Sequence, residues 1–322
     1  MLKRFLAVFV AAVCAAPLAA VAQSYPNKPV RMYTQFGPGT PGDVFGRVLG
    51  AAMTPIMGQT VVVDSRPGGG GVLVAGLVAR AEPDGYTVAI LTATVPVAGA
   101  VLSRSTLPFD PLKDLTPVVS LIESNSVIVV NAALPVNSLK ELIDYARANP
   151  GKLSYGTTGV GSSHHLSGEQ LDMLTGGKMV HIPYKTSPVV DAASGVLPMA
   201  ISITPQTMPL IRAGKIRPIA VTTAKRFRLL PDVPTVGESL PQFEPLPAWT
   251  GIYGPAGLPQ AVVQRLHANA AAALALPETQ AKIREIGFEP VVSASQADFL
   301  ARSRRGVELT ERIVKAAKIE TK

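Results

Sequence analysis

The sequence contains a single cysteine, Cys14, which lies in an apolar stretch near the start of the chain. The remaining residues therefore offer no thiol for a disulfide or for a soft metal ion. There are four histidines, and none has the His-x-x-x-His spacing that places two imidazoles on one face of a helix. The sequence predicts no metal site, no disulfide and no bound cofactor.

Aromatic residues make up only 5% of the chain, so side chains on which nucleobases could stack are scarce. The chain has 30 Lys and Arg against 22 Asp and Glu, a net charge of +8, and the basic residues are scattered along it. A basic protein concentrates small anions around itself, whereas nucleic-acid binding usually requires clustered positive charge. We expect a small anionic ligand and no nucleic acid.

Long apolar runs are also absent, except for one within residues 1–22. Lys3 and Arg4 precede this run, and Ala20-Val21-Ala22 ends it with the small-x-small pattern of a signal-peptide cleavage site. We expect a signal peptide over residues 1–22, cleavage before Gln23, and export to the periplasm. A membrane anchor is the alternative, but the run is short for a span of ~20 residues and no positive cluster follows it.

The rest of the chain alternates short β-rich runs with helical runs. Strands are expected at residues 30–36, 60–64 and 86–91. Residues 42–57 and 71–80 are expected to be the helices between them, because apolar residues recur at helical spacing. This βαβαβ order predicts a parallel sheet with right-handed crossovers.

A second α/β block follows the first. Ser138 and Glu141 have the spacing of a capping box that begins a helix ending at Ala148. Further strands are expected at residues 153–156, 179–183, 199–203 and 218–222, and residues 260–322 are expected to be largely helical. Two such blocks predict two lobes, with a ligand cleft between them.

Two glycine-containing loops each lead into a predicted helix, one at residues 36–43 (FGPGTPGD) and one at residues 156–163 (GTTGVGSS). Glycine permits close backbone approach, and the first N–H groups of a helix lack internal partners and carry partial positive charge. Such loops can hold an anion without Arg or Lys. The alternative is that both are ordinary strand-to-helix turns.

Signatures of enzymes and of nucleotide binding do not fit. Residues 161–165 (GSSHH) lack the Gly-x-Ser-x-Gly pattern of a nucleophile elbow. The four glycines of residues 67–71 (PGGGG) precede no lysine, so we interpret them as a flexible turn. We expect no catalytic residue. An enzyme using Ser162 or Ser163 with His164 or His165 is the less favoured alternative.

Short motifs in a fixed order cover nearly the whole chain after residue 22. They are Tyr25–Arg31 (YPNKPVR), Phe36–Asp43, Asp84–Thr87 (DGYT), Phe109–Pro111 (FDP), Asp114–Val118 (DLTPV), Tyr155–Glu169, Ile182–Lys185 (IPYK), Leu230–Thr235 (LPDVPT) and Trp249–Gly257. Together they resemble the Bug-type extracytoplasmic solute-binding proteins of tripartite tricarboxylate transporters.

The resemblance implies a two-lobed periplasmic binding protein of the type II, or Venus flytrap, class. Backbone N–H groups, hydroxyls and bridging waters of the two loops would hold the carboxylate of a small ligand. The resemblance and the repeated blocks predict a discontinuous domain I at residues 23–122 and 226–322, and domain II at residues 123–225. The implied protein is a monomer whose protein partners are the membrane components of such a transporter, or alternatively a membrane signalling protein.

The ligand-binding candidates are the loop residues and one threonine beside a strand of each block. They are Phe36, Gly37, Pro38, Gly39, Thr40, Gly42, Asp43, Thr92, Thr157, Thr158, Gly159, Gly161, Ser162, Ser163 and Thr204. The family's frequent Asp near Thr204 is absent, with Ser202 and Gln206 nearby. Because that carboxylate would pair with an amino group, its absence favours a plain mono- or dicarboxylate, aromatic ones included, over an amino acid.

Overall fold

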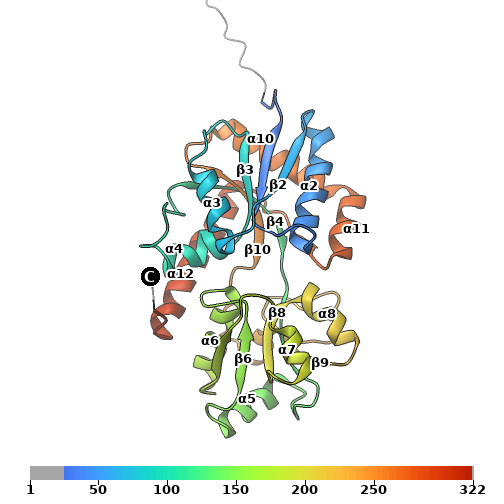
Figure 1. Cartoon of the computed structure of the whole chain (residues 1–322), viewed down its shortest axis with the longest axis vertical. Coiled ribbons are helices and arrows are strands. Elements are labelled where there is room, and N and C mark those ends of the chain that lie inside the picture. Colours follow the sequence, from blue (N-terminus) through green and yellow to red (C-terminus); the bar gives the residue numbers. More distant parts are fainter. Residues whose placement is uncertain (1–24, 321–322) are drawn as a thin grey trace, which may run out of the picture.

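The computed structural model describes residues 25–320, so the predicted signal peptide lies outside the described residues. Two sheets, of six and five strands, form the centres of two lobes that lie one above the other in Figure 1. Strands β1 to β4 belong to the six-stranded sheet, β5 to β9 form the other sheet, and β10 and β11 return to the first. The predicted two-lobed α/β architecture is confirmed.

The first lobe begins with the predicted βαβαβ order. β1 (Val30–Thr34) lies between β2 (Val61–Ser65) and β3 (Thr87–Thr92) and runs parallel to both. The helices between these strands are α2 (Pro41–Met57) and α3 (Val72–Ala79). A proline at the first position favours the start of α2, and a left-handed glycine ends it.

The first sheet is mixed, whereas the sequence predicted a parallel one. β10 (Trp249–Pro255) runs antiparallel between β3 and β4 (Leu115–Glu123), and β11 (Glu289–Pro290) pairs antiparallel with β4 at the edge. The parallel prediction therefore holds for β1 to β3 only. Three short helical segments flank α3 and β3: η1 (Gly69–Gly71), η2 (Thr94–Gly99) and α4 (Ala100–Leu102).

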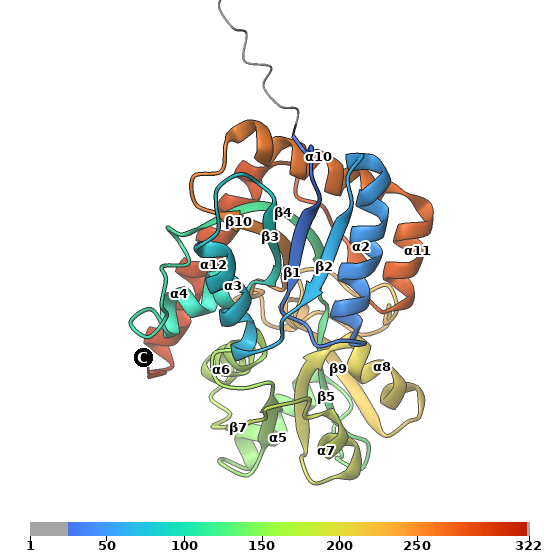
Figure 2. The ribbon, with the colours of Figure 1, turned by 45° about the horizontal axis from the view of Figure 1, so that its top comes forward.

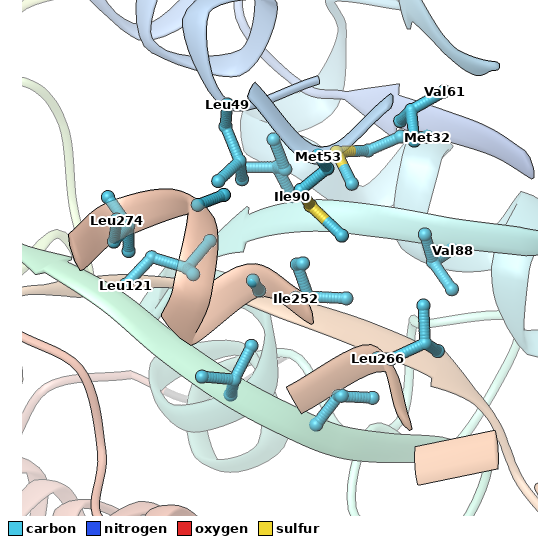
Figure 3. Close-up of a cluster of buried hydrophobic side chains, with 14 of the residues drawn as sticks. Met32, Leu49, Met53, Val61, Val88, Ile90, Leu121, Ile252, Leu266 and Leu274 are labelled. Atoms are coloured by element: carbon cyan, nitrogen blue, oxygen red, sulfur yellow. The ribbon is translucent and has the colours of Figure 1, made fainter. Parts of the chain in front are cut away.

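The C-terminal part is helical, as predicted, and covers the first lobe with α10 (Gln260–Ala275), α11 (Pro277–Glu285) and α12 (Gln296–Ala316). Figure 2 shows α11 beside α2, and α10 also contacts α2. Figure 3 shows fully buried side chains from the strands meeting those of α2 and α10, among them Met53, Ile90 and Leu266. Each such side chain stabilises the fold by about 1.5–3 kcal/mol relative to exposure.

The second lobe is built on the sheet order β7-β6-β8-β5-β9. β6 (Ser154–Thr157) runs parallel to β7 (Val180–Pro183) and β8 (Met199–Ile203). β5 (Ser126–Asn131) runs antiparallel to β8 and to β9 (Ile216–Val221). The helices of this lobe are α5 (Leu139–Ala148), α6 (Ser163–Thr175), α7 (Val189–Ser194), α8 (Thr204–Arg212) and α9 (Val236–Ser239).

The capping box predicted before α5 forms only in half. The Ser138 hydroxyl accepts from the Glu141 N–H at 3.2 Å, as expected. The Glu141 carboxylate, however, accepts from the backbone N–H of Asn137 at 2.8 Å rather than from that of Ser138. A complete capping box joins Thr235 and Glu238 at the start of α9, a helix that the sequence did not predict.

The chain passes between the sheets twice, at residues 124–125 and between β9 and β10. Phe227, Leu230 and Val233 pack with residues of the second sheet, and so do Val236 and Phe243. The sequence placed the return to domain I at residue 226. Because the segment up to Phe243 packs on the second lobe, we propose that the return lies at residues 244–248.

Candidate functional site

A cavity of about 310 Å³ lies between the lobes, where residues of both sheets meet the two crossing segments. The first lobe contributes Gln35, Gly70, Thr92, Ala93 and Thr94; the second contributes Thr158, Ser162, Ser163, His164, Ile203 and Gln206; and the crossings and the start of β10 contribute Ser124, Pro247, Ala248 and Trp249. The cavity thus lies at the carboxyl ends of parallel strands, where open α/β sheets bind ligands.

The wall of this cavity carries no formal charge. Lys, Arg, Asp and Glu are absent from its lining residues, and His164 is the only imidazole among them. Burial lowers the pKa of His164 to about 4, so its ring is neutral at neutral pH. An anion in this cavity would therefore be held by hydroxyls, amides and backbone dipoles, which cost less desolvation than buried ion pairs.

The second loop ends at the N-terminus of α6, where Ser162 is the N-cap as predicted. Its hydroxyl accepts from the His165 N–H at 3.1 Å and donates to the Gly159 carbonyl at 2.8 Å. Serine is favoured at this position because it satisfies an N–H that has no partner within the helix. The sequence therefore placed this helix terminus correctly, and the terminus faces the cavity through Ser162, Ser163 and His164.

The donors at this terminus differ from those expected. The Gly161 N–H donates to Nδ1 of His165 at 3.1 Å, and the Ser162 N–H donates to the Gly159 carbonyl at 3.3 Å. Both N–H groups therefore have acceptors inside the loop, whereas the prediction had these groups of Gly161 and Ser162 available to a ligand. The N–H groups of Ser163 and His164 have no acceptor among residues 25–320. These two are the donors that remain for an anion.

The His164 ring fixes the wall of the cavity from inside the second lobe. Its Nε2 lies 3.0 Å from the Ser126 hydroxyl, and its Nδ1 lies 3.2 Å from the Thr158 hydroxyl. A neutral imidazole donates at one nitrogen and accepts at the other, so it satisfies both hydroxyls. Thr158 is thereby oriented at the cavity, and the ring connects β5 with the loop before α6.

In the first lobe, Gln35 orients a cavity threonine, as His164 does in the second lobe, and it connects two strands. Sequence reasoning missed Gln35. Its side chain donates to the Thr92 hydroxyl at 3.2 Å and accepts from the Thr92 N–H at 3.1 Å, which joins the ends of β1 and β3. A Cβ on Gly71 would lie 2.6 Å from Oε1 of Gln35. The glycine-rich turn at residues 67–71 therefore packs against Gln35, and its Gly70 lines the cavity.

Residues 36–43 of the first loop are not among the residues that line this cavity. The buried carboxylate of Asp43 accepts from the Gly39 N–H at 3.0 Å, from Nε of Arg47 at 3.0 Å and from the Ser65 hydroxyl. Burial alone would raise the pKa of Asp43, but these hydrogen bonds outweigh burial and lower it. An ionised carboxylate of the protein thus already lies at the N-terminus of α2.

The bonds of Thr40 complete this arrangement. Its hydroxyl donates to the Gly37 carbonyl at 2.8 Å and accepts from the Asp43 N–H at 3.4 Å. Both bonds of the Thr40 hydroxyl lie within the loop and the first turn of α2. They give the loop a structural role, and its role in ligand binding stays a prediction.

Of the remaining candidates, Thr92, Thr158, Ser162 and Ser163 line the cavity, whereas Thr157, Gly159, Gly161 and Thr204 do not. Thr157 is buried, and its hydroxyl lies 2.7 Å from Nε2 of His181. Thr204 is fully buried, and its hydroxyl has no partner within the described part of the chain. Gly159 and Gly161 shape the loop with positive φ angles of 117° and 79°.

Sequence reasoning also missed lining residues from the crossing segments and from α8. Ser124 and Trp249 lie where the chain passes between the sheets, so only the fold brings them to the cavity. Gln206 lies in the first turn of α8, which follows β8 directly, and it accepts from the Ser202 hydroxyl at 2.7 Å. The position of Gln206 shortly after the predicted strand at residues 199–203 was the available signal, whereas Gln35 fell inside the predicted strand at residues 30–36, which the structure ends at Thr34.

Comparison with known proteins gives a consistent result. The profile described as "Tripartite tricarboxylate transporter family receptor" matches residues 45–317. Protein BugT of Bordetella pertussis is 33% identical over 282 residues, which cover 87% of this chain and 86% of BugT.

Two solved structures are similar over nearly their whole length. The structure of R. palustris Rpa4515 with adipate has a TM-score of 0.80 and 35% identity, and it covers 92% of this chain and 99% of that one. The periplasmic binding protein BugD has a TM-score of 0.77 and 31% identity, with 92% and 100% covered. Within residues 25–320, no helix is long and apolar enough to cross a membrane.

Proposed function

The chain belongs to the tripartite tricarboxylate transporter receptor family, a family of periplasmic solute-binding receptors, and we propose that its interlobe cavity captures a small carboxylate. Membership in a receptor family supports binding and release of a solute rather than turnover. Export through the predicted signal peptide would place the protein in the periplasm. There it would deliver the solute, as a monomer, to the membrane components of its transporter.

The observation that carries this proposal is the N-terminus of α6. The N–H groups of Ser163 and His164 lack acceptors among residues 25–320, and both residues line an uncharged cavity beside the hydroxyls of Thr158 and Thr94. A hydrogen bond to an ionised group contributes about 1.5–3 kcal/mol, so two would supply about 3–6 kcal/mol. A micromolar dissociation constant requires about 8 kcal/mol. Hydroxyl bonds and burial of the solute's carbon chain would supply the remainder.

The lining also restricts the solute. An amino acid carries an ammonium group, which requires a carboxylate or several carbonyl acceptors when it leaves water. No Asp or Glu lines the cavity. Rpa4515, one of the similar structures, was solved with adipate, which has no amino group. We therefore propose a mono- or dicarboxylate without an amino group for this chain.

Capture would involve closure of the two lobes. The cavity takes its lining from both lobes and from the crossing segments, so a solute there contacts both lobes at once. Two crossings that lie side by side allow a hinge motion, which such contacts would drive toward a closed state. Small-angle scattering should show a smaller radius of gyration when a bound carboxylate is present.

The decisive experiment is a thermal-shift screen of the mature protein against a panel of mono- and dicarboxylates, with the corresponding amino acids as controls. A solute present at 100 times its dissociation constant adds about 2.7 kcal/mol of stability. We expect stabilisation by carboxylates and none by the amino acids. A panel in which no carboxylate raises the melting temperature, confirmed by calorimetric titration, would contradict the proposed function.

A further inference from the structure

The cavity continues into a second cavity of about 260 Å³ on the side of α4 and η2. The two cavities share four lining residues, Gly70, Thr94, Thr158 and Ser162. A molecule bound at the N-terminus of α6 can therefore extend past these residues without leaving the protein surface. We call this second cavity the annex.

The annex differs from the first cavity in its chemistry. Most of the side chains that line only the annex are apolar, namely Val72, Val95, Ala98, Leu102, Leu107 and Val160, and Ser103 adds a single hydroxyl. Neither an acidic nor a basic residue lines it, and no imidazole does. Gly69 and Gly70, which line the annex without side chains, lie on an exposed turn.

Val160 is the exposed member of this set. It lies in the loop before α6, and 65% of its surface is exposed. The neighbouring Gly161 approaches Leu102 of the other lobe so closely that a Cβ on it would lie 2.6 Å from Cδ1 of Leu102. The loop that would hold the carboxylate therefore also forms one apolar wall of the annex.

We propose that the preferred solute is an amphiphilic monocarboxylate, whose carboxylate binds at the N-terminus of α6 and whose alkyl or aryl tail fills the annex. This inference rests on the proposed function, because it assumes a carboxylate at α6. A dry apolar cavity of about 150 Å³ is large enough to bind benzene, so the annex can accept one aromatic ring or a short alkyl chain. A second carboxylate placed there would lose water without gaining a charged partner, which is unfavourable.

The test is calorimetric titration of the mature protein with acetate, butanoate, hexanoate, 3-phenylpropanoate and adipate. Burial of a methylene contributes about 0.8 kcal/mol, which corresponds to about fourfold in affinity. In a partly open annex we expect each methylene to tighten binding about two- to fourfold. Hexanoate should bind at least about tenfold more tightly than adipate, which has the same carbon chain but a second charge.

Two surface variants separate the annex from a general effect of apolarity. Val160→Ser should weaken hexanoate binding about threefold or more and leave acetate binding unchanged, because only the tail reaches Val160. Val190→Ser is the matched control, since Val190 is 66% exposed and does not line either cavity. It should change neither affinity.

The outcomes distinguish this inference from the proposed function. If adipate binds more tightly than hexanoate, or if affinity does not rise with chain length, the annex does not hold a tail and only this inference is overturned. This inference alone is also overturned if Val160→Ser and Val190→Ser have equal affinities for hexanoate. If none of the five compounds binds, the proposed carboxylate function fails and the inference falls with it.

Discussion

The rings of His165 and His181 stack with their centroids 3.9 Å apart and their planes tilted by 31°. Below them, the Tyr155 hydroxyl donates to the Glu169 carboxylate at 2.5 Å. Nδ1 of His165 accepts the Gly161 N–H, so this nitrogen is unprotonated in the folded protein. The stacked pair thus supports the loop that leads into α6, and it does so in the neutral form.

Because of this histidine pair, we expect the folded protein to lose stability as the pH falls. Burial lowers the pKa of His165 to about 4, with a further contribution from His181, and burial lowers that of His181 to about 4. In the unfolded chain both titrate near 6.5. Below about pH 6.5 the unfolded state therefore binds more protons than the folded state, and the free energy of unfolding falls as pH decreases toward 4.

The slope is at most about 1.4 kcal/mol per pH unit for each histidine. Urea unfolding at pH 7.5, 6.5 and 5.5 measures it, in a window above most carboxyl titrations. His165→Gln should be less stable at pH 7.5, and its stability should depend less on pH. Equal unfolding free energies at pH 7.5 and 5.5 for the unsubstituted protein would show that the pair is accessible to protons when folded.

The second prediction concerns the close contact between Gly168 of α6 and the ring of Tyr155. A Cβ on Gly168 would lie 2.2 Å from the Tyr155 ring, which is fully buried. The ring has no space to shift, because its hydroxyl bonds to Glu169 and its face packs on His181. Gly168→Ala should therefore destabilise the protein by about 1–3 kcal/mol or more through overpacking.

The matched control is Gly237→Ala in α9, where nothing lies closer to a new Cβ than 3.8 Å. Alanine in a helix is favoured over glycine by about 0.5–1 kcal/mol, so this variant should be as stable as the parent or more so. Denaturant midpoints compare the two. If Gly168→Ala also stabilises, α6 and β6 are not packed as closely as described.

The strands that the sequence predicted are those with clear local signals. β1, β2 and β3 alternate with helices of recurring apolar spacing, so each was placed within a few residues. β4, β5, β10 and the two-residue β11 were missed. β5 is buried at five consecutive positions and β10 at all seven, so neither shows the polar alternation of a half-exposed strand. Their partners also lie far along the chain, as with β10 and β3, and local patterns do not encode such pairings.

For the site, as for the strands, the sequence predicted the features that have a local signal and missed those that depend on tertiary contacts. Ser162 as an N-cap follows from a hydroxyl residue after glycine and before a helical run, a local signal. Which N–H groups remain available for a ligand depends on His165, because its ring accepts from the Gly161 N–H four residues earlier, and tertiary packing sets the orientation of this ring. The role of Trp249 and Ser124 depends on where the chain crosses between sheets, which no local pattern reveals.

The first loop can be tested through its own carboxylate. Asp43 is 3% exposed at its side chain and accepts from three groups that converge on it. Asp43→Asn keeps the size but removes the charge and leaves the bond from Arg47 without its ionic partner. We expect a loss of about 2–4 kcal/mol in the free energy of unfolding, because hydrogen bonds to a buried charged acceptor are removed.

Asp144→Asn is the control, since Asp144 pairs with Lys140 at 2.6 Å on the surface, and exposed pairs contribute about 0–1 kcal/mol. The two variants have the same change in charge. Carboxylate affinity, measured by titration, should change little in either variant if the first loop is structural. A marked increase in affinity for Asp43→Asn would instead show that the ligand binds near this carboxylate.

The N-terminus of α6 gives the sharpest test, through Ser162→Asp. Aspartate is as good an N-cap as serine, and its charge interacts favourably with the helix terminus by about 0.3–1 kcal/mol. It cannot donate to the Gly159 carbonyl, which costs about 1 kcal/mol, so the melting temperature of the free protein should change by only a few degrees. Ser138→Asp, at the N-cap of α5 and outside the cavity, is the matched control.

The effect of Ser162→Asp on binding should be much larger than its effect on stability. A carboxylate at residue 162 would lie close to the Ser163 and His164 N–H groups, where the solute's own carboxylate is proposed to bind. Two like charges ~4 Å apart repel by about 1 kcal/mol in water and by about 4 kcal/mol at an effective dielectric of 20. Affinity for a carboxylate identified in the screen should therefore fall about tenfold or more in Ser162→Asp and stay unchanged in Ser138→Asp. Dissociation constants that are equal for Ser162→Asp and the unsubstituted protein would mean that the carboxylate binds elsewhere, and the loop before α6 would then be structural only.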